Sequence, residues 1–232
     1  TPSNSSAASD VYKRQALDRA VANGVKNLVV QPTHLMHGAE YDELMEAVDA
    51  YKDKFESVKV AEPLLGEVGA DASAINADKK AVAEAITAEA VKTAGFDTLD
   101  AAKEDGVAFV FMGHGTSHNA KVSYSQMQAQ MKDLGYENVF IGTVEGEPEE
   151  TACENVINAV AEAGYTKVVL RPLMVVAGDH ANNDMAGDDD DSWKSMFNAS
   201  GKFESVDCQI AGLGEIEAIQ NLYVAHTAEA MK

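Results

Sequence analysis

The chain repeats part of its own sequence, and this repeat limits the possible folds more than any other feature. Residues 24–38 (GVKNLVVQPTHLMHG) align with residues 164–178 (GYTKVVLRPLMVVAG) at an offset of 140. Two more matches follow in the same order, because KFESV occurs at both 54–58 and 202–206 and TAEA also recurs. Three ordered matches indicate a duplicated half. A unit this long is no solenoid repeat, so we expect two similar lobes.

Strand and helix patterns alternate through the second half. Apolar runs predict strands at 108–112, 139–142, 167–170 and 206–210, and helical spacing predicts helices over 124–134, 149–163, 192–199 and 215–229. Such alternation is typical of parallel sheets covered on both faces. We therefore predict an α/β fold with two doubly wound lobes, residues 16–95 and 96–232, in which the last helix of the first lobe can cross over. Ligands of such sheets bind at the carboxyl ends of the strands, here in a cleft between the lobes.

Composition excludes several functions. The chain has 38 Asp and Glu against 18 Lys and Arg, a formal net charge of −20, which repels nucleic acid and anionic membrane surfaces. Its apolar runs are far shorter than the roughly 18 residues of a membrane helix. The two cysteines, Cys153 and Cys208, form no CxxC motif, so we expect no disulfide framework and a cytoplasmic location. Residues 1–15 (TPSNSSAASDVYKRQ) are interpreted as a foreign or disordered tail.

Two loops that follow predicted strands carry candidate reactive groups. His114 stands between Gly113 and Gly115, where the glycines allow a ligand to approach the backbone and leave the imidazole accessible. Glu145 occupies the first positions after the 139–142 strand and is expected to point into the cleft, whereas Glu147, Glu149 and Glu150 look like ordinary acids at a helix N-terminus. His118 is the weaker candidate of the first loop.

The loop after the 167–170 strand adds His180, which is expected to face the His114 loop. Two imidazoles and one carboxylate suit divalent ions such as Co²⁺, Ni²⁺, Fe²⁺ or Zn²⁺, and three ligands with an open position indicate a reactive site. The run 188–191 is most simply a solvated acidic segment, and a cation site there is the minor alternative. In the first half, His34 and His37 are either substrate contacts or residues of the cleft rim.

Four segments together resemble a known family. They are QPTHLMHGAEY (31–41), FMGHGTSHNA (111–120), IGTVEGEP (141–148) and RPLMVVAGDHANNDMAGD (171–188). The sequence resembles the sirohydrochlorin cobaltochelatases of the CbiK type, which belong to the class II chelatases, over nearly all of 16–232. The resemblance implies two similar α/β lobes and the ATP-independent insertion of Co²⁺ into sirohydrochlorin in cobalamin (vitamin B12) biosynthesis. Co²⁺ is then the substrate metal, and no organic cofactor is expected.

The resemblance also implies site residues. His114 would accept pyrrole protons and bind the metal, Glu145 would share in catalysis and complete the metal site, and His180 would be the third metal ligand. The expected contacts of the tetrapyrrole are Glu40, Gly113, Gly115, Thr116, Ser117 and Met174. Partners would be sirohydrochlorin, Co²⁺ and a possible second copy of the chain, without nucleic acid or membrane. Two alternatives stay open: a chelatase for Fe²⁺ or Ni²⁺ with a related tetrapyrrole, and a metal or tetrapyrrole carrier without turnover.

One departure from the family concerns the start of the chain. Family members begin with an apolar strand, whose duplicate here is the 107–112 strand, and at the offset of 140 it would fall before residue 1. We therefore expect a first lobe that lacks its N-terminal strand.

The net charge of the chain raises a second question, because sirohydrochlorin is a polycarboxylate. Arg171, Lys121 and the backbone N–H groups of the 113–117 loop are the candidate groups for its carboxylates.

Overall fold

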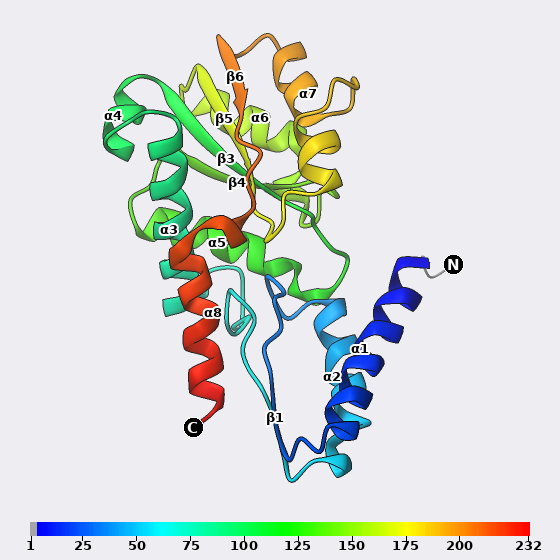
Figure 1. Ribbon diagram of the computed structural model, residues 1–232. Coiled ribbons are helices and arrows are strands. Elements are labelled where there is room, and N and C mark those ends of the chain that lie inside the picture. Colours follow the sequence, from blue (N-terminus) through cyan, green and yellow to red (C-terminus); the bar gives the residue numbers. More distant parts are fainter. Residues whose placement is uncertain (1–3) are drawn as a thin grey trace.

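The computed structural model describes residues 4–232, and its larger sheet has four parallel strands in the order β4-β3-β5-β6. The strands are β3 (Val107–Gly113), β4 (Val139–Thr143), β5 (Lys167–Pro172) and β6 (Ser205–Cys208). Phe111 pairs with Ile141 on one side and with Arg171 on the other. Every residue of β3 is buried because it is a central strand with helices on both faces. Figure 1 shows this sheet in the upper lobe.

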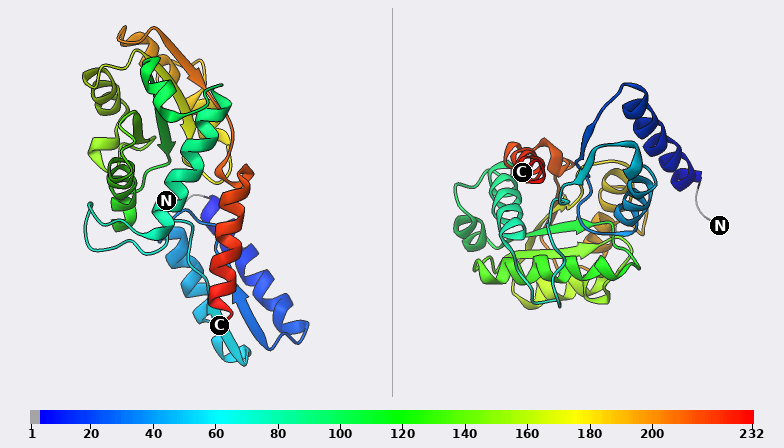
Figure 2. Two further views of the ribbon diagram at one scale, coloured as in Figure 1. Left: turned by 90° about the vertical axis from the view of Figure 1, so that its left-hand side faces the viewer. Right: turned by 90° about the horizontal axis from the view of Figure 1, so that it is seen from below.

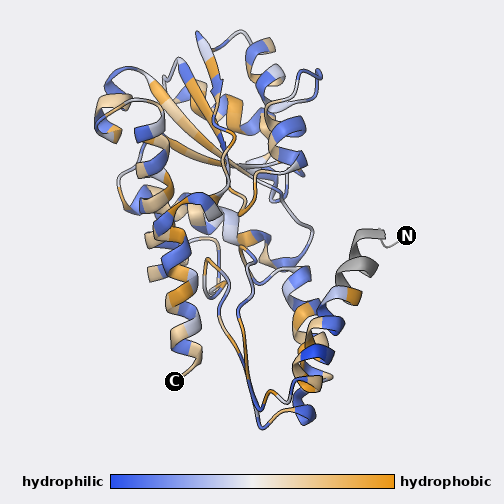
Figure 3. Cartoon of the chain, in the orientation of Figure 1, coloured by the Kyte–Doolittle hydropathy of each residue, from blue (hydrophilic) through white to orange (hydrophobic). Residues whose placement is uncertain are grey.

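Helices cover both faces of this sheet, and successive side chains of β3 alternate between them. Phe109 and Phe111 pack with Met127 on one face, while Val110 and Met112 belong to a second cluster on the other. The helices of this half are α4 (Leu99–Glu104), α5 (Val122–Asp133), α6 (Cys153–Glu162) and α7 (Trp193–Ala199), with 3-10 turns at Asn119–Lys121, Glu149–Thr151 and Leu213–Glu215 and a π-helix at His180–Met185. Figure 3 shows the apolar residues concentrated on the strands of this lobe.

The first lobe is smaller and is built on two parallel strands, β1 (Asn27–Val30) and β2 (Ser57–Val60). By the repeat, β1 corresponds to β5 and β2 to β6. Within residues 4–232 no third strand pairs with either one, as the sequence predicts for this lobe. Two helices, α1 (Asn4–Ala22) and α2 (Ala39–Asp49), pack together beside the strands, and a 3-10 turn spans Lys52–Lys54.

Two helices tie the lobes together by crossing from one to the other (Figures 1 and 2). Helix α3 (Ala77–Thr93) follows the first lobe in sequence, but its buried face packs against α5 of the second. Helix α8 (Glu217–Ala230) ends the chain and returns to the first lobe. There the Tyr223 hydroxyl donates to the carbonyl oxygen of His34 at 3.2 Å, and Thr227 Oγ1 donates to Gln31 Oε1 at 2.8 Å.

Several element boundaries differ from the sequence expectation. The helix expected over 149–163 begins only at Cys153, because Thr151 Oγ1 bonds to the carbonyl oxygen of Pro148 and Ala152 is extended. Helix α1 begins at Asn4, so most of the segment interpreted as a tail is helical; its foreign origin stays a prediction, and residues 1–3 lie outside the described residues. In the part of the chain that the structure describes, no helix combines the length and apolar character needed to span a bilayer.

Candidate functional site

The loops that follow β3 and β4 are held in register with each other. The backbone N–H of Val144 donates to the carbonyl oxygen of Gly113 at 3.0 Å, and that of Glu145 donates to the carbonyl oxygen of His114 at 2.9 Å. These two bonds join the loops to each other just past the ends of the strands. Gly115 sits between the loops with φ +90°, and a Cβ there would lie 2.7 Å from Cβ of Glu145. The site therefore needs glycine at 115 for both the backbone angle and the space.

His114 is exposed, and its hydrogen bond sets the tautomer of the ring. Nδ1 lies 2.9 Å from the carbonyl oxygen of Gly115. A carbonyl oxygen can only accept, so Nδ1 carries the hydrogen in this contact. The neutral ring then has its lone pair on Nε2, free to accept a proton or bind a metal.

His180 begins the π-helix and lies against His114. The two ring centroids are 4.4 Å apart, and the rings are nearly perpendicular at 85°. His180 Nδ1 lies 2.5 Å from Asp184 Oδ2, one turn further along the same helix. The carboxylate accepts from Nδ1 and leaves Nε2 as the free lone pair, which is the usual support for a metal-binding histidine. The expected meeting of the two imidazoles is present.

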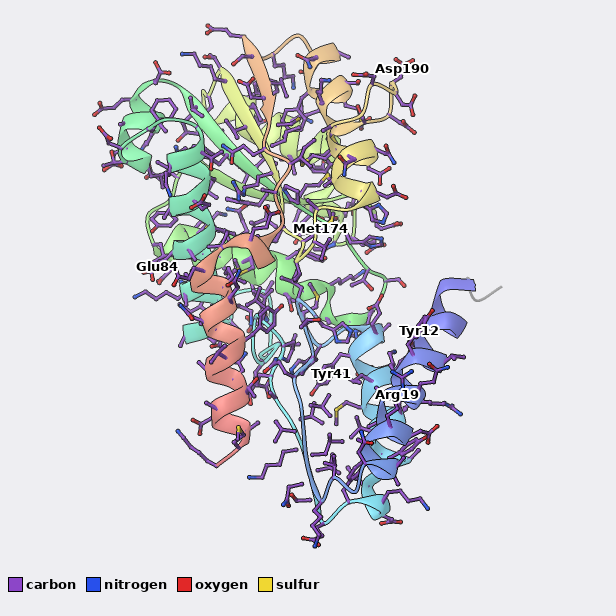
Figure 4. The ribbon with its side chains drawn as sticks, viewed as in Figure 1. Tyr12, Arg19, Tyr41, Glu84, Met174 and Asp190 are labelled. Carbon is purple, nitrogen blue, oxygen red and sulfur yellow. The ribbon has the colours of Figure 1, made fainter. Side chains whose placement is uncertain are left out.

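The cleft between the lobes has a volume of about 680 Å³ and takes its walls from both halves of the chain. Figure 4 shows Met174 where the two lobes meet. The lining residues of the first lobe are His34, Leu35, Met36, Gly38 and Glu40, and those of the second are His114, Gly115, Thr116, Ser117, Tyr124, Glu145, Glu147, Leu173, Met174 and Val175. A cleft of this size fits a large organic ligand better than a metal ion alone.

Five of the six expected tetrapyrrole contacts line this cleft, and Gly113 is the exception. Gly113 is buried behind the cleft, where a Cβ would lie 2.3 Å from the Tyr124 ring. Glu145 lines the cleft beside His114, but its side chain is not gathered with the two imidazoles. Among residues 4–232, no group of three or more His, Cys, Asp and Glu side chains is close enough to hold a metal ion.

The other histidines separate into a cleft residue and residues that support the fold. His34 lines the cleft, whereas His37 stacks on Tyr41 and lies 2.7 Å from Glu62. His118 Nδ1 accepts from the backbone N–H of Ala120, and its Nε2 lies 3.1 Å from Asp42 Oδ2. Both ring nitrogens of His118 are thus occupied, and the residue joins the His114 loop to helix α2.

Burial affects the titratable groups of the cleft wall. Burial lowers the pKa of His34, against the opposing effect of Glu40 and Glu43, and burial raises the pKa of the Tyr124 hydroxyl. The Tyr124 hydroxyl accepts from the backbone N–H of Gly115 at 3.2 Å. His34 Nδ1 is buried and has no hydrogen-bond partner among the described residues.

The lowered pKa of His34 predicts a pH dependence of stability. The folded state disfavours the charged imidazole, so below about pH 6.5, the ordinary value for histidine, the unfolded state binds more protons. The free energy of unfolding should therefore fall as the pH drops below this value, and His34→Gln should make that fall smaller. Urea denaturation of both proteins at pH 7.5 and 5.5 measures the difference. If the free energy of unfolding depends on pH equally in the two proteins, the lowered pKa of His34 is contradicted.

Sequence reasoning missed three residues of the site. Glu147, interpreted as an ordinary helix N-terminal acid, lies before the helix, lines the cleft and pairs with Lys121. The sequence DHANND contains Asp184 four residues after His180, a spacing that could have indicated their contact. Tyr124 was considered only as part of a helix, and nothing in its spacing indicates that its hydroxyl reaches the Gly115 backbone.

Arg171 and the acidic run 188–191 both lie away from the cleft. Arg171 is buried and donates to Gln209 Oε1 at 2.7 Å, so it does not face the cleft as a group for tetrapyrrole carboxylates. Figure 4 places Asp190 at the outer end of the second lobe, far from Met174. The acidic run 188–191 is therefore a surface segment away from the cleft, in which Asp188 pairs with Lys194 at 3.0 Å.

Comparison with known proteins agrees with this fold. The solved structure of the sirohydrochlorin chelatase SirB from Bacillus subtilis subspecies spizizenii, in complex with cobalt, matches with a TM-score of 0.54 at 14% identity, over 94% of this chain and 74% of that one. This likeness concerns the fold alone. With two α/β lobes around a cleft, the chain has a chelatase-like fold.

Sequence comparison then gives the particular family. The chain belongs to the cobalt chelatase (CbiK) family, whose sequence model matches residues 10–232. It is 33% identical to the sirohydrochlorin cobaltochelatase of Salmonella typhimurium, over 94% of this chain and 73% of the relative. It is 32% identical to the sirohydrochlorin cobaltochelatase CbiKC of Nitratidesulfovibrio vulgaris, over 94% of this chain and 70% of the relative. The relatives are metal chelatases, and the chain is an enzyme of this kind.

Proposed function

We propose that this chain inserts Co²⁺ into sirohydrochlorin. The observation that carries the proposal is the contact between the His114 and His180 rings beside the cleft, in a member of the cobalt chelatase family. The names of the relatives from Salmonella typhimurium and Nitratidesulfovibrio vulgaris support the same metal and the same macrocycle. We further propose that the reaction needs no ATP and serves cobalamin biosynthesis in the cytoplasm.

The proposed chemistry exchanges protons for a metal. Two pyrrole N–H protons leave the ring while its nitrogens form bonds to one Co²⁺. Once the ion has passed from His114 Nε2 to the ring nitrogens, the Nε2 lone pair is free again and accepts a pyrrole proton, while Nδ1 stays bonded to the Gly115 carbonyl oxygen. The cleft holds the macrocycle through the contacts proposed above, namely Glu40, Gly115, Thr116, Ser117 and Met174. Each proton then passes from His114 to water.

The proposed metal ligands are Nε2 of His114, Nε2 of His180 and the carboxylate of Glu145. The two imidazoles already lie together, and the Glu145 backbone is bonded to His114. Rotation of the Glu145 side chain completes the set, because its carboxylate is not gathered with the rings in the structure. Imidazole and carboxylate ligands suit borderline divalent ions, and an open position lets the ion pass to the ring.

The proposal can be tested by the absorbance of sirohydrochlorin mixed with Co²⁺, without ATP. We expect the chain to accelerate the spectral change above a control without protein. Fe²⁺ and Ni²⁺ in place of Co²⁺ test the alternative of another chelated metal. Binding of the macrocycle without acceleration by any of the three metals would favour the carrier function and contradict the enzyme assignment.

Asp184 provides a test of the metal site that does not depend on turnover. Its carboxylate lies 2.5 Å from His180 Nδ1, so Asp184→Asn should misorient the imidazole and weaken Co²⁺ binding by about 10–100-fold. Isothermal titration of the protein with Co²⁺ measures the affinity. Asp179→Asn is the matched control, because Asp179 lies in the same segment but contacts Asn183 and not an imidazole. Equal affinities of the two variants would exclude the supporting role of Asp184.

A further inference from the structure

The charge of the cleft conflicts with the charge of the proposed substrate. Sirohydrochlorin carries many carboxylates, the chain has a net charge of −20, and the cleft wall contributes Glu40, Glu145 and Glu147. No Lys or Arg is among the described residues that line the cleft. An unscreened acidic cleft would repel the macrocycle, so a cation close to the wall is needed for affinity.

Lys121 is such a cation, and it is joined to the cleft wall. Its Nζ lies 2.5 Å from Oε2 of Glu147, and the two side chains are 39% and 43% exposed. Both groups are thus accessible to solvent and to a ligand. Because a partly exposed ion pair contributes little to stability, a carboxylate from outside can replace Glu147 at little cost.

The backbone on both sides of this pair is fixed. Lys121 ends a 3-10 turn whose N-cap His118 accepts from the N–H of Ala120, and Lys121 N–H donates to the His118 carbonyl oxygen. On the other side the Glu147 N–H donates to Thr143 Oγ1 at 3.1 Å, and Thr143 is buried. The backbone positions that carry the Lys121 and Glu147 side chains are therefore fixed at the rim of the cleft, close to the His114 loop.

We propose that Lys121 binds a carboxylate side chain of the tetrapyrrole and that Glu147 occupies Lys121 until the substrate displaces it. This inference rests on the proposed function. The positive charge of the Lys121 ammonium group keeps a negative partner throughout the exchange, because one carboxylate replaces another. It also turns Glu147 toward solvent and removes its charge from the point where the substrate carboxylate binds.

The proposal predicts opposite effects for the two members of the pair. Lys121→Gln should weaken the binding of metal-free sirohydrochlorin by about two- to fivefold, and Glu147→Gln should strengthen it by about two- to fivefold, which is the range for an exposed ion pair. The dissociation constant is measured by fluorescence anisotropy of sirohydrochlorin without metal. Salt should weaken binding to the unchanged chain more than binding to Lys121→Gln.

Matched controls come from the ion pair between Lys103 and Glu137, which lies outside the cleft. Lys103→Gln and Glu137→Gln change the net charge equally and should leave the dissociation constant within about twofold. If both Lys121→Gln and Glu147→Gln weaken binding and lower the melting temperature, the pair is only a structural clamp and the proposal is wrong. Unchanged binding in both variants would also overturn it. No binding to the unchanged chain would overturn the proposed substrate as well.

Discussion

Replacing His114 with alanine should lower the rate of Co²⁺ insertion by roughly 10²–10⁴-fold, the usual loss when a general base is removed. His114 is placed to act in this way because Nδ1 bonds to the Gly115 carbonyl oxygen and Nε2 remains free beside His180. Removal of the ring also takes away one proposed metal ligand. The initial rate of the sirohydrochlorin spectral change with Co²⁺ measures the effect.

His118→Ala separates this effect from a general disturbance of the loop. His118 lies four residues further on, but its nitrogens contact the Ala120 N–H and Asp42. We expect less than about a tenfold loss of rate for this variant. Circular dichroism should show both variants folded, since His114 is exposed. A His114→Ala rate that matches the unchanged chain would remove His114 from the mechanism.

The second large effect is expected for Gly115→Ala. Left-handed backbone costs a residue with a side chain about 1–2 kcal/mol, and Gly115 has φ +90°. The new Cβ would also lie 2.7 Å from Cβ of Glu145 and 3.2 Å from Cβ of Thr143. Pushing Glu145 away should reduce the rate of metal insertion by about tenfold or more, because a 1 Å displacement in a reactive site has large effects. Urea denaturation and the absorbance assay measure the two losses.

Gly135→Ala is the matched control for backbone strain. Gly135 also has a positive φ, +74°, but a Cβ there meets nothing within 4 Å. This variant should lose about the same stability from strain and keep its rate of insertion. If the two variants lose activity equally, the close approach of Gly115 to Glu145 has no part in the reaction.

The sequence predicted the fold through features that are local or repeated. The strand at 107–113 is apolar at nearly every position because it is central and buried on both faces, and the glycines after it mark the cleft loop. Helix α3 shows the limit of such patterns. Its apolar residues indicate a buried helix, but periodicity does not say which lobe buries it, and the structure packs it on α5 of the second.

The candidate site was predictable where a residue type carries chemistry by itself. His114 and His180 stand in loops after strands, so the rule for parallel sheets was sufficient to bring them together. The position of Glu147 at the cleft was not predicted, because its contact depends on a partner, Lys121, that lies 26 residues away in sequence. The tautomer of His114 and the buried Tyr124 hydroxyl likewise depend on contacts that only the folded chain defines.

The crossing of α3 and α8 has a consequence for the evolution of this fold. Each half of the sequence contributes a helix to the other half. Val82 and Ile86 of α3 lie in a core cluster with Phe109 and Phe111 of the second lobe, and Tyr223 of α8 bonds to the backbone of His34 in the first. A gene cut between the repeats would give two fragments, and each would lack the helix that the other half contributes to it. We therefore expect neither half to fold stably without the other.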